Sequence, residues 1–144
     1  MMRFMVLVKA DKNSEAGVLP SKELLAAMGQ FNEEMVKAGV LLAAEGLHAS
    51  SKGARISFSG RNRLVTDGPF AETKELLAGF WLIQVTSKEE AIEWVKRVPF
   101  ANGEVAEVRQ VFEASDFPSE IFPPEDAARE QALRDELQRK AAKP

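Results

Sequence analysis

The sequence contains no cysteine, which excludes disulfide bonds, thiolate catalysis, iron–sulfur clusters and zinc sites built on thiolates. It has one histidine and no paired metal-ligand motif, so a metal site would need scattered carboxylates, and we expect none. Basic residues are not in excess either. The net charge is −3 and the pI is about 5.3. This argues against nucleic acid as the main partner, because the chain has no excess of basic residues to neutralise the phosphates of a nucleic acid.

Long apolar runs are also missing. No run approaches the roughly 18 residues that a membrane-spanning helix needs, so we expect no membrane contact. The first residues lack the charged start, apolar segment and cleavage site of a signal peptide, and we therefore expect a cytoplasmic protein. The glycines are isolated, so they form no phosphate-binding loop and no nucleophile elbow, and we expect no cofactor.

The residues that are present describe an ordinary globular protein. Hydrophobic residues make up 45% of the 144 positions and charged residues 28%. A chain of this length buries roughly 70% of its unfolded surface, which is enough for a proper core. We predict one α+β domain over residues 1–118, followed by a C-terminal tail with a polar helix over residues 119–144.

Apolar residues alternate with polar ones in several short stretches, which is typical of β-strands. The pattern predicts strands at residues 2–9, 40–47, 54–58, 64–66, 79–85 and 105–112. A turn at residues 60–63 joins the third and fourth of these into a hairpin. The first and fifth are apolar on both faces, as expected of central strands. We expect a loop at residues 10–19 and one helical turn at residues 73–78.

Two amphipathic helices are predicted between these strands. Ser21 caps the first, which runs to about Ala38. Ser87 with Glu90 forms a capping box for the second, which Pro99 stops. The order of elements predicts a ferredoxin-like βαββαβ unit with an inserted hairpin and both helices on one face of the sheet.

The opposite face of this sheet stays largely apolar and needs a partner. A two-fold homodimer that packs sheet face against sheet face would bury it. Beyond Phe112, the apolar residues Phe117, Ile121 and Phe122 stand among prolines, which makes the segment too apolar for a free linker. We expect this tail to lie across the dimer partner or to close over a pocket mouth.

The stretch from Leu64 to Glu75 combines a strand with a sharp bend. Gly68 can adopt positive φ without steric cost, Pro69 fixes its own φ, and Asp67 can accept hydrogen bonds from nearby amides. Such a bend places charged groups at a strand end, where a small-molecule site is expected. An ordinary turn has the same composition, so both interpretations stay open.

His48 and Asp67 are the residues predicted to carry acid–base chemistry. A histidine with a pKa near 6.5 suits proton transfer at neutral pH. The strand before His48 and the strand that ends in Thr66 are expected to bring their ends together, and Asp67 would then orient the imidazole. The alternatives are a loop histidine without a role and an aspartate that only caps the turn.

Five further residues are predicted to contact a ligand. Glu72 and Lys74 would present charge or hold the turn through an ion pair, and Arg55 would bind a carboxylate. Phe70 and Trp81 would form an aromatic wall for a flat molecule. Solvated charges explain the first three equally well, and core packing explains the two aromatic residues.

Four stretches of the chain form a recognisable set of motifs: Glu45-Gly46-Leu47-His48, the run from Val65 to Glu75, Gly79-Phe80-Trp81 and residues 90–97. They resemble the motifs of the YCII-related or DGPF-domain family of small bacterial α+β proteins. The resemblance covers roughly residues 2–118. It implies the fold of the dimeric α+β barrel superfamily and a His/Asp acid–base couple at His48 and Asp67. Many members have a proline after the histidine, where this chain has Ala49.

Two functional hypotheses follow. The first is a cofactor-free enzyme of the lyase or isomerase type, in which His48 moves a proton on a small aromatic or quinonoid organic acid and Asp67 orients it. The alternative is a non-enzymatic dimeric module that binds a small molecule or a protein and has a regulatory role. In both, the expected partners are a second copy of the chain and a small-molecule ligand.

Overall fold

A computed structural model of the chain describes residues 1–142. They form two compact units, of which the first spans Met1–Val111 and the second begins at Phe112. The strands are β1 (Met2–Lys9), β2 (Leu41–Gly46), β3 (Ala54–Ser59), β4 (Asn62–Asp67), β5 (Leu77–Val85) and β6 (Ala106–Gln110). The helices are α1 (Lys12–Glu15), α2 (Lys22–Lys37), α3 (Lys88–Val95) and α4 (Pro124–Ala141), and short 3-10 turns lie at Ser50–Lys52, Thr73–Glu75 and Ala114–Asp116.

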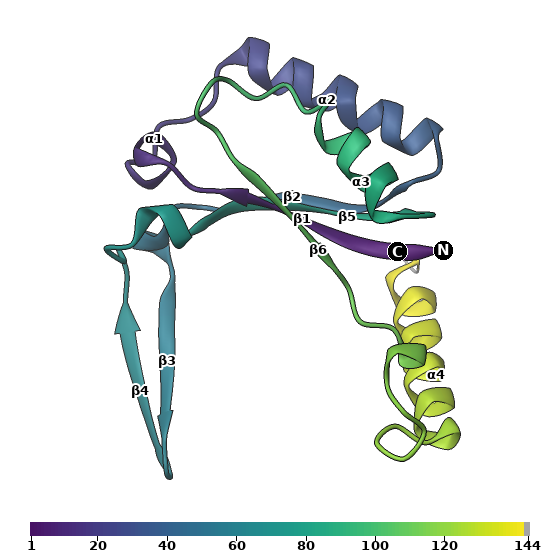
Figure 1. Cartoon of the computed structure of the whole chain (residues 1–144). Coiled ribbons are helices and arrows are strands. Elements are labelled where there is room, and N and C mark those ends of the chain that lie inside the picture. Colours follow the sequence, from purple (N-terminus) through teal and green to yellow (C-terminus); the bar gives the residue numbers. More distant parts are fainter. Residues whose placement is uncertain (143–144) are drawn as a thin grey trace. The chain divides into compact units, whose positions relative to one another are not determined.

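Four strands of the first unit form an antiparallel sheet in the order β2-β5-β1-β6. This is the arrangement of a ferredoxin-like α+β fold, with the β3–β4 hairpin inserted between β2 and β5, and it confirms the predicted fold class. The helices α2 and α3 lie on one face of the sheet (Figure 1). The two central strands are β5 and β1, as their two-sided apolar patterns predicted.

The core lies between the sheet and these two helices. Successive side chains of a strand point to opposite faces, so alternate residues of β1 and β5 point toward the helices. Phe4, Val6 and Ile83 are at most 2% exposed and pack in one cluster with Phe31 and Met35 of α2. The strand residues of this cluster form one of the two apolar faces that the sequence indicated for each central strand.

The caps that start α2 and α3 are serines, as predicted. The backbone N–H of Leu24 donates to Ser21 Oγ at 3.1 Å, and that of Glu90 donates to Ser87 Oγ at 3.1 Å. The carboxylate of Glu90 accepts from the backbone N–H of Thr86 at 2.7 Å and not from that of Ser87. Only the Ser87 half of the predicted capping box therefore forms. The Glu90 carboxylate instead binds the backbone of Thr86, one residue before the N-cap.

One local prediction in the first unit is wrong, and another is confirmed only in part. The predicted loop at residues 10–19 contains α1, because Asp11 and Ser14 cap each other: Ser14 N donates to Asp11 Oδ1 at 2.8 Å and Asp11 N donates to Ser14 Oγ at 2.9 Å. The predicted helical turn at residues 73–78 is a 3-10 turn that gives way to β5 at Leu77. Pairing of β5 with its neighbours here overrides the helix propensity of the sequence.

Several element boundaries also differ from the prediction, and two of them have a clear local cause. The hairpin turn is shorter than residues 60–63, because Gly60 has φ 56° and β4 already begins at Asn62. The helix α3 ends at Val95, about one turn before Pro99, so the proline does not itself end the helix.

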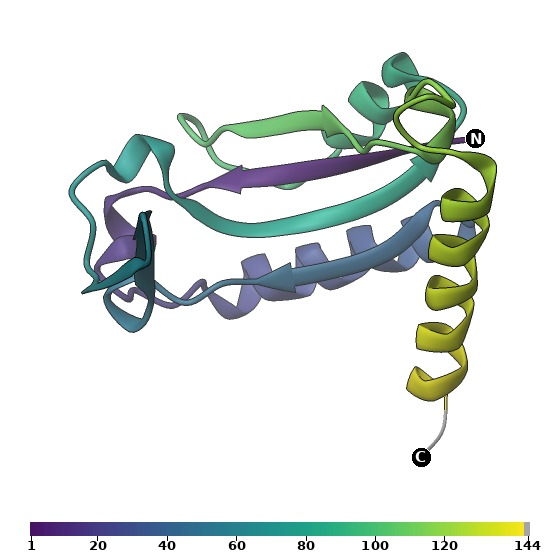
Figure 2. The same ribbon diagram turned by 90° about the horizontal axis from the view of Figure 1, so that it is seen from below.

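The hairpin formed by β3 and β4 is a separate two-stranded sheet. It extends away from the four-stranded sheet on the side opposite α2 and α3 (Figure 1). All twelve residues of its two strands are exposed, including Ile56, Phe58 and Val65. When the sheet is viewed from the side opposite α2 and α3, α2 lies behind it (Figure 2). No helix of the first unit covers this face of β1 and β5.

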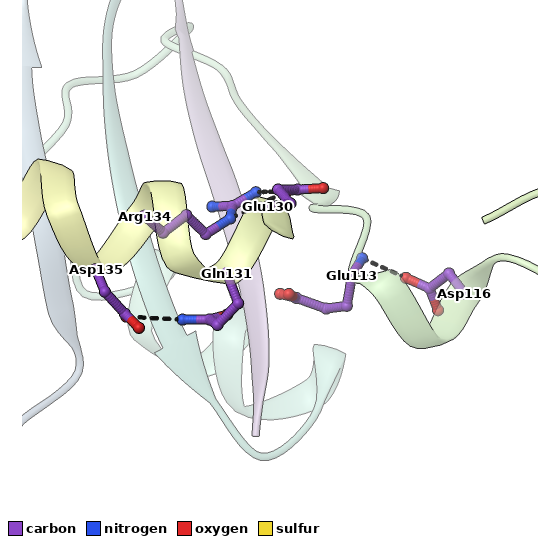
Figure 3. Close-up of polar contacts among 6 residues, drawn as sticks. All are labelled: Glu113, Asp116, Glu130, Gln131, Arg134 and Asp135. Carbon is purple, nitrogen blue, oxygen red and sulfur yellow. Dashed lines mark hydrogen bonds and ion pairs between the residues drawn. The ribbon is translucent and has the colours of Figure 1, made fainter. Parts of the chain in front are cut away.

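The second unit consists of an aromatic cluster and α4. The rings of Phe112 and Phe117 have centroids 5.1 Å apart, and those of Phe117 and Phe122 5.9 Å. The backbone N–H of Glu113 donates to Asp116 Oδ2 at 2.7 Å and caps the 3-10 turn at Ala114–Asp116 (Figure 3). Pairs along α4, such as Gln131–Asp135, are exposed (Figure 3). Among the described residues, no helix is both long and apolar enough to cross a membrane.

Candidate functional site

Ser50 joins three segments at one corner of the first unit. Its backbone N–H donates to Glu15 Oε2 at 2.8 Å, and its hydroxyl donates to Glu15 Oε1. The same hydroxyl oxygen accepts from the backbone N–H of Phe70 at 3.0 Å. The hydrogen bonds from the side chain and the backbone of Ser50 hold the pKa of Glu15 below its usual value, because they favour the carboxylate form. We call this arrangement the Ser50 corner.

Gly68 contacts the Ser50 corner more closely than any other residue type would allow. A Cβ atom at Gly68 would lie 1.8 Å from the carbonyl oxygen of Ser50. The backbone N–H of Gly68 donates to the carbonyl oxygen of Gly53 at 3.0 Å. The bend after β4 and the turn after β2 are therefore in direct backbone contact, and the glycine is required for this approach and not for a positive φ.

His48 and Asp67 lie on the two segments that meet here. His48 is two residues before Ser50, and Asp67 immediately precedes Gly68. Both are exposed, and within residues 1–142 neither side chain makes a hydrogen bond or an ion pair. The backbone thus brings the two segments together without joining the two side chains, and the acid–base pair stays a prediction.

The predicted ligand-binding residues around the bend are largely solvated. The Arg55 guanidinium lies 3.9 Å from the centroid of the Phe70 ring, so these two predicted residues do contact each other. Glu72 and Lys74 are both exposed, and no ion pair joins them in the described part of the chain. The neighbouring Glu75 lies 3.9 Å from the ammonium of Lys9.

A pocket of about 330 Å³ lies elsewhere, between α2 and the sheet. We call it the α2 pocket. Helix α2 contributes Leu24, Leu25, Met28 and Asn32 to its lining, and β2 and β5 contribute Ala44, Glu45, Gly46, Ala78, Gly79, Phe80 and Trp81. Val8, Pro20 and Phe100 complete it. Of the predicted site residues, Trp81 lines this pocket, whereas His48, Asp67, Arg55, Phe70, Glu72 and Lys74 do not.

Small residues on two paired strands create the space for this pocket. Gly46 of β2 lies opposite Gly79 of β5 in the sheet register. A Cβ atom at Gly79 would lie 2.9 Å from the carbonyl oxygen of Glu45, whereas one at Gly46 would meet nothing within 4 Å. Gly79 is thus required by packing, while the absence of a side chain at Gly46 leaves open volume.

One polar side chain of α2 stands among the apolar lining. The indole N–H of Trp81 donates to Asn32 Oδ1 at 2.8 Å. An indole is only a donor, so the oxygen of Asn32 faces Trp81 and its amide NH₂ is left as a donor. Within residues 1–142 this NH₂ group has no hydrogen-bond partner. The pocket therefore offers one hydrogen-bond donor inside an apolar and aromatic wall.

The residues that sequence reasoning missed are Glu15, Ser50, Asn32 and Gly46. Glu15 lies in the segment that was predicted to be a loop, and its partner Ser50 is 35 residues away, so no local pattern joins them. The one sequence signal for Asn32 is that it is a polar residue on the apolar face of a predicted helix. Gly46 was included in the motif that ends in His48, but its open space depends on the packing of α2.

The described residues contain no group of three or more His, Cys, Asp or Glu side chains that would hold a metal ion. The two sites offer the following polar and ionisable side chains. At the Ser50 corner these are His48, Asp67 and the nearby cation Arg55. In the α2 pocket it is the Asn32 amide, because Glu45 lies opposite Phe80 in the sheet register and its side chain points to the other face of the sheet.

The fold and these sites define a small ferredoxin-like α+β protein with an inserted hairpin. The chain belongs to the YCII-related domain family, which matches residues 2–115 and confirms the family that the motifs indicated. An uncharacterised protein of Rhizobium meliloti (strain 1021) is 33% identical to it over 81 residues. The match spans 56% of this chain and 65% of that relative, which is just under two thirds of the relative's length.

Proposed function

We propose that the chain binds a small, neutral, largely apolar organic molecule in the α2 pocket. The observation that carries this proposal is the pocket itself, which is walled by Trp81, Phe100 and Met28 and offers the Asn32 amide as one donor. A volume of about 330 Å³ is within the range of small-ligand pockets. An aromatic ring with one carbonyl or ether oxygen matches this lining.

The lack of positive charge in the lining favours a neutral ligand over an acid. No lysine or arginine lines the pocket. A carboxylate placed there would lose its hydration without gaining a cation, which is costly. This preference separates the binding proposal from an enzyme that acts on an organic acid.

Acetophenone is a suitable probe, because it is one aromatic ring with one carbonyl acceptor. Its titration into ¹⁵N-labelled protein should shift the side-chain amide signals of Asn32 and the indole signal of Trp81. Benzoate should bind at least tenfold more weakly, for the electrostatic reason above. If millimolar acetophenone leaves both side-chain signals unmoved, the pocket is not a site for such molecules.

Two glycine variants give this experiment a matched control. Gly46→Leu should abolish the shifts, because its side chain enters the open volume of the pocket. Gly29→Leu adds the same side chain to α2. A Cβ atom at Gly29 also meets nothing within 4 Å, but Gly29 does not line the pocket. It should leave the shifts unchanged, and an equal loss in both variants would contradict the assignment.

A second candidate function is cofactor-free acid–base catalysis of the lyase or isomerase type, by His48 and Asp67. The Ser50 corner favours it, because the corner fixes the two segments that carry these residues against each other. The Cα atom of His48 is at most about 7.6 Å from that of the pocket residue Gly46, since two peptide units separate them. Catalytic hydrogen bonds often tighten only when substrate is bound.

In this second candidate the substrate is a small aromatic or quinonoid acid, and Arg55 and Lys74 supply positive charge near the bend. Phenylpyruvate is the probe, followed by NMR as its methylene protons exchange with D₂O. The wild-type protein should accelerate the exchange, and His48→Ala should remove about 100-fold of that acceleration without unfolding the chain. Equal rates for the two proteins would reject catalysis by His48.

We also propose that two copies of the chain form a dimer through the uncovered face of the sheet. Met5 lies opposite Leu82 and Leu7 opposite Phe80 on this face, which no helix of the first unit covers (Figure 2). Contiguous apolar side chains of this kind usually mark an interface. Sedimentation equilibrium should give twice the chain mass of 15.9 kDa, and a single-chain mass at 100 μM protein would refute the dimer.

A further inference from the structure

One face of the β3–β4 hairpin is an apolar surface without a cover. Ile56 lies opposite Val65 and Phe58 opposite Arg63, so these four side chains share a face, which we call the hairpin face. Ile56, Phe58 and Val65 are 50%, 72% and 60% exposed. A two-stranded hairpin is marginally stable in water by itself, so such side chains need a partner surface.

The hairpin is also basic, which narrows the chemistry of that partner. Residues 52–63 contain Lys52, Arg55, Arg61 and Arg63 and no acidic residue. The guanidinium of Arg63 lies 4.7 Å from the centroid of the Phe58 ring, so positive charge stands directly beside the largest apolar side chain. A surface that fits the hairpin face is therefore apolar and acidic.

Residues 112–126 have this complementary composition. They contain Glu113, Asp116, Glu120, Glu125 and Asp126 and no lysine or arginine. Phe112 and Ile121 are each 71% exposed, near the edge-to-face rings of Phe117 and Phe122. The hairpin face and this segment are both exposed in the single chain, and each supplies the charge that the other lacks.

We infer that residues 112–126 of one copy lie on the hairpin face of a second copy. The contact places aromatic side chains against Ile56, Phe58 and Val65 and acidic side chains beside Arg61 and Arg63. This inference rests on the proposed homodimer and adds to it the surfaces that the two chains exchange. Two-fold symmetry makes the contact twice, so each copy covers the hairpin of the other.

The cysteine-free sequence allows a direct cross-linking test. Phe58→Cys and ¹⁵N-labelled Ile121→Cys are mixed and oxidised, so that a mixed disulfide product can only join different copies and has its own mass. We expect this product in at least tenfold excess over the one from Phe58→Cys and Leu133→Cys. Leu133 is also an exposed apolar residue, 59% exposed, but lies outside residues 112–126.

Charge reversal supplies a second, independent readout. Arg61→Glu should raise the dimer dissociation constant at least tenfold at low salt, and adding Glu120→Arg to the same chain should restore most of the loss, because the charges are again opposite. Sedimentation equilibrium measures both. Arg61 is exposed on the hairpin turn, so its replacement does not disturb the core.

The outcomes separate this inference from the proposals on which it rests. A single-chain mass for the wild-type protein would overturn both the dimer and the exchanged contact. A stable dimer whose Phe58–Ile121 product stays at the Leu133 level would overturn the contact alone. The contact alone would also be overturned if the double variant Phe58→Cys/Ile121→Cys formed its disulfide only within one chain.

Discussion

Replacing Gly68 by alanine should break the contact between the bend and the turn after β2. The added Cβ atom would lie 1.8 Å from the carbonyl oxygen of Ser50 and 2.6 Å from its carbonyl carbon. Both neighbours are backbone atoms, so no flexible side chain can move out of the way. The bend or the turn must shift by more than an ångström, by a rough comparison with ordinary van der Waals contacts.

The cost of Gly68→Ala combines lost hydrogen bonds with overpacking. The bonds from Gly68 N to Gly53 O and from Phe70 N to Ser50 Oγ, each 3.0 Å long, would be lost. Each is worth about 1 kcal/mol of net stability. Overpacking adds about 1–3 kcal/mol, at the low end here because the bend is near the surface. We therefore expect a loss of about 3 kcal/mol, or roughly 9 °C in Tm for a chain of this size.

Urea unfolding of Gly68→Ala measures the global loss, and hydrogen exchange of the Phe70 amide measures the local one. Gly53→Ala is the matched control, because its Cβ atom would lie at an ordinary 3.5 Å from the same oxygen of Ser50. It should change stability by no more than about 0.5 kcal/mol. A wild-type unfolding curve with unchanged protection of Phe70, or an equal loss in the control, would refute the steric reasoning.

Ser50→Ala should raise the pKa of Glu15 part of the way to its usual value, because the side-chain hydrogen bond is lost and the backbone one is kept. In the wild-type protein the folded-state pKa of Glu15 is lowered, so its stabilisation is present above the unfolded-state pKa of about 4.3 and is lost as the pH falls through the folded value. Trp81→Phe should destabilise the fold by about 1–3 kcal/mol, because Asn32 Oδ1 loses its part-buried donor.

A control variant of the same residue type tests each of these two predictions. Ser51→Ala, at an exposed neighbouring serine, should leave the NMR titration of the Glu15 carboxyl unchanged. Trp94→Phe removes the same ring volume without an indole bond to Asn32, and should cost less in thermal unfolding than Trp81→Phe. An unmoved Glu15 titration in Ser50→Ala, or equal losses for the two tryptophan variants, would contradict these assignments.

Local patterns were sufficient for the framework of the fold. Apolar patterns gave β1 and β5 as central strands, and the serine caps gave the starts of α2 and α3. Both signals act over a few residues, which is why a single sequence carries them. The order of elements then left few ways to pair the strands, and the observed sheet follows one of them.

Local patterns failed where the outcome depends on neighbours from elsewhere in the chain. The helix-forming residues before β5 become a 3-10 turn and a strand, since pairing with β1 and β2 satisfies their backbone groups. The single turn of α1 depends on a reciprocal cap between Asp11 and Ser14 that a loop composition also permits. In both cases the propensity was a weak prior that another interaction outweighed.

The motifs around His48 and Asp67 indicated the family and the segments that meet, because a strand, a bend and a glycine are written in consecutive residues. Consecutive residues do not encode the hydrogen bonds between Ser50 and Glu15, the open space at Gly46 or the pairing of Asn32 with Trp81. Each joins atoms from elements that are distant in sequence. Distances between such atoms are set by how α2 and the turns pack on the sheet, and packing is a property of the folded chain and not of any stretch of it.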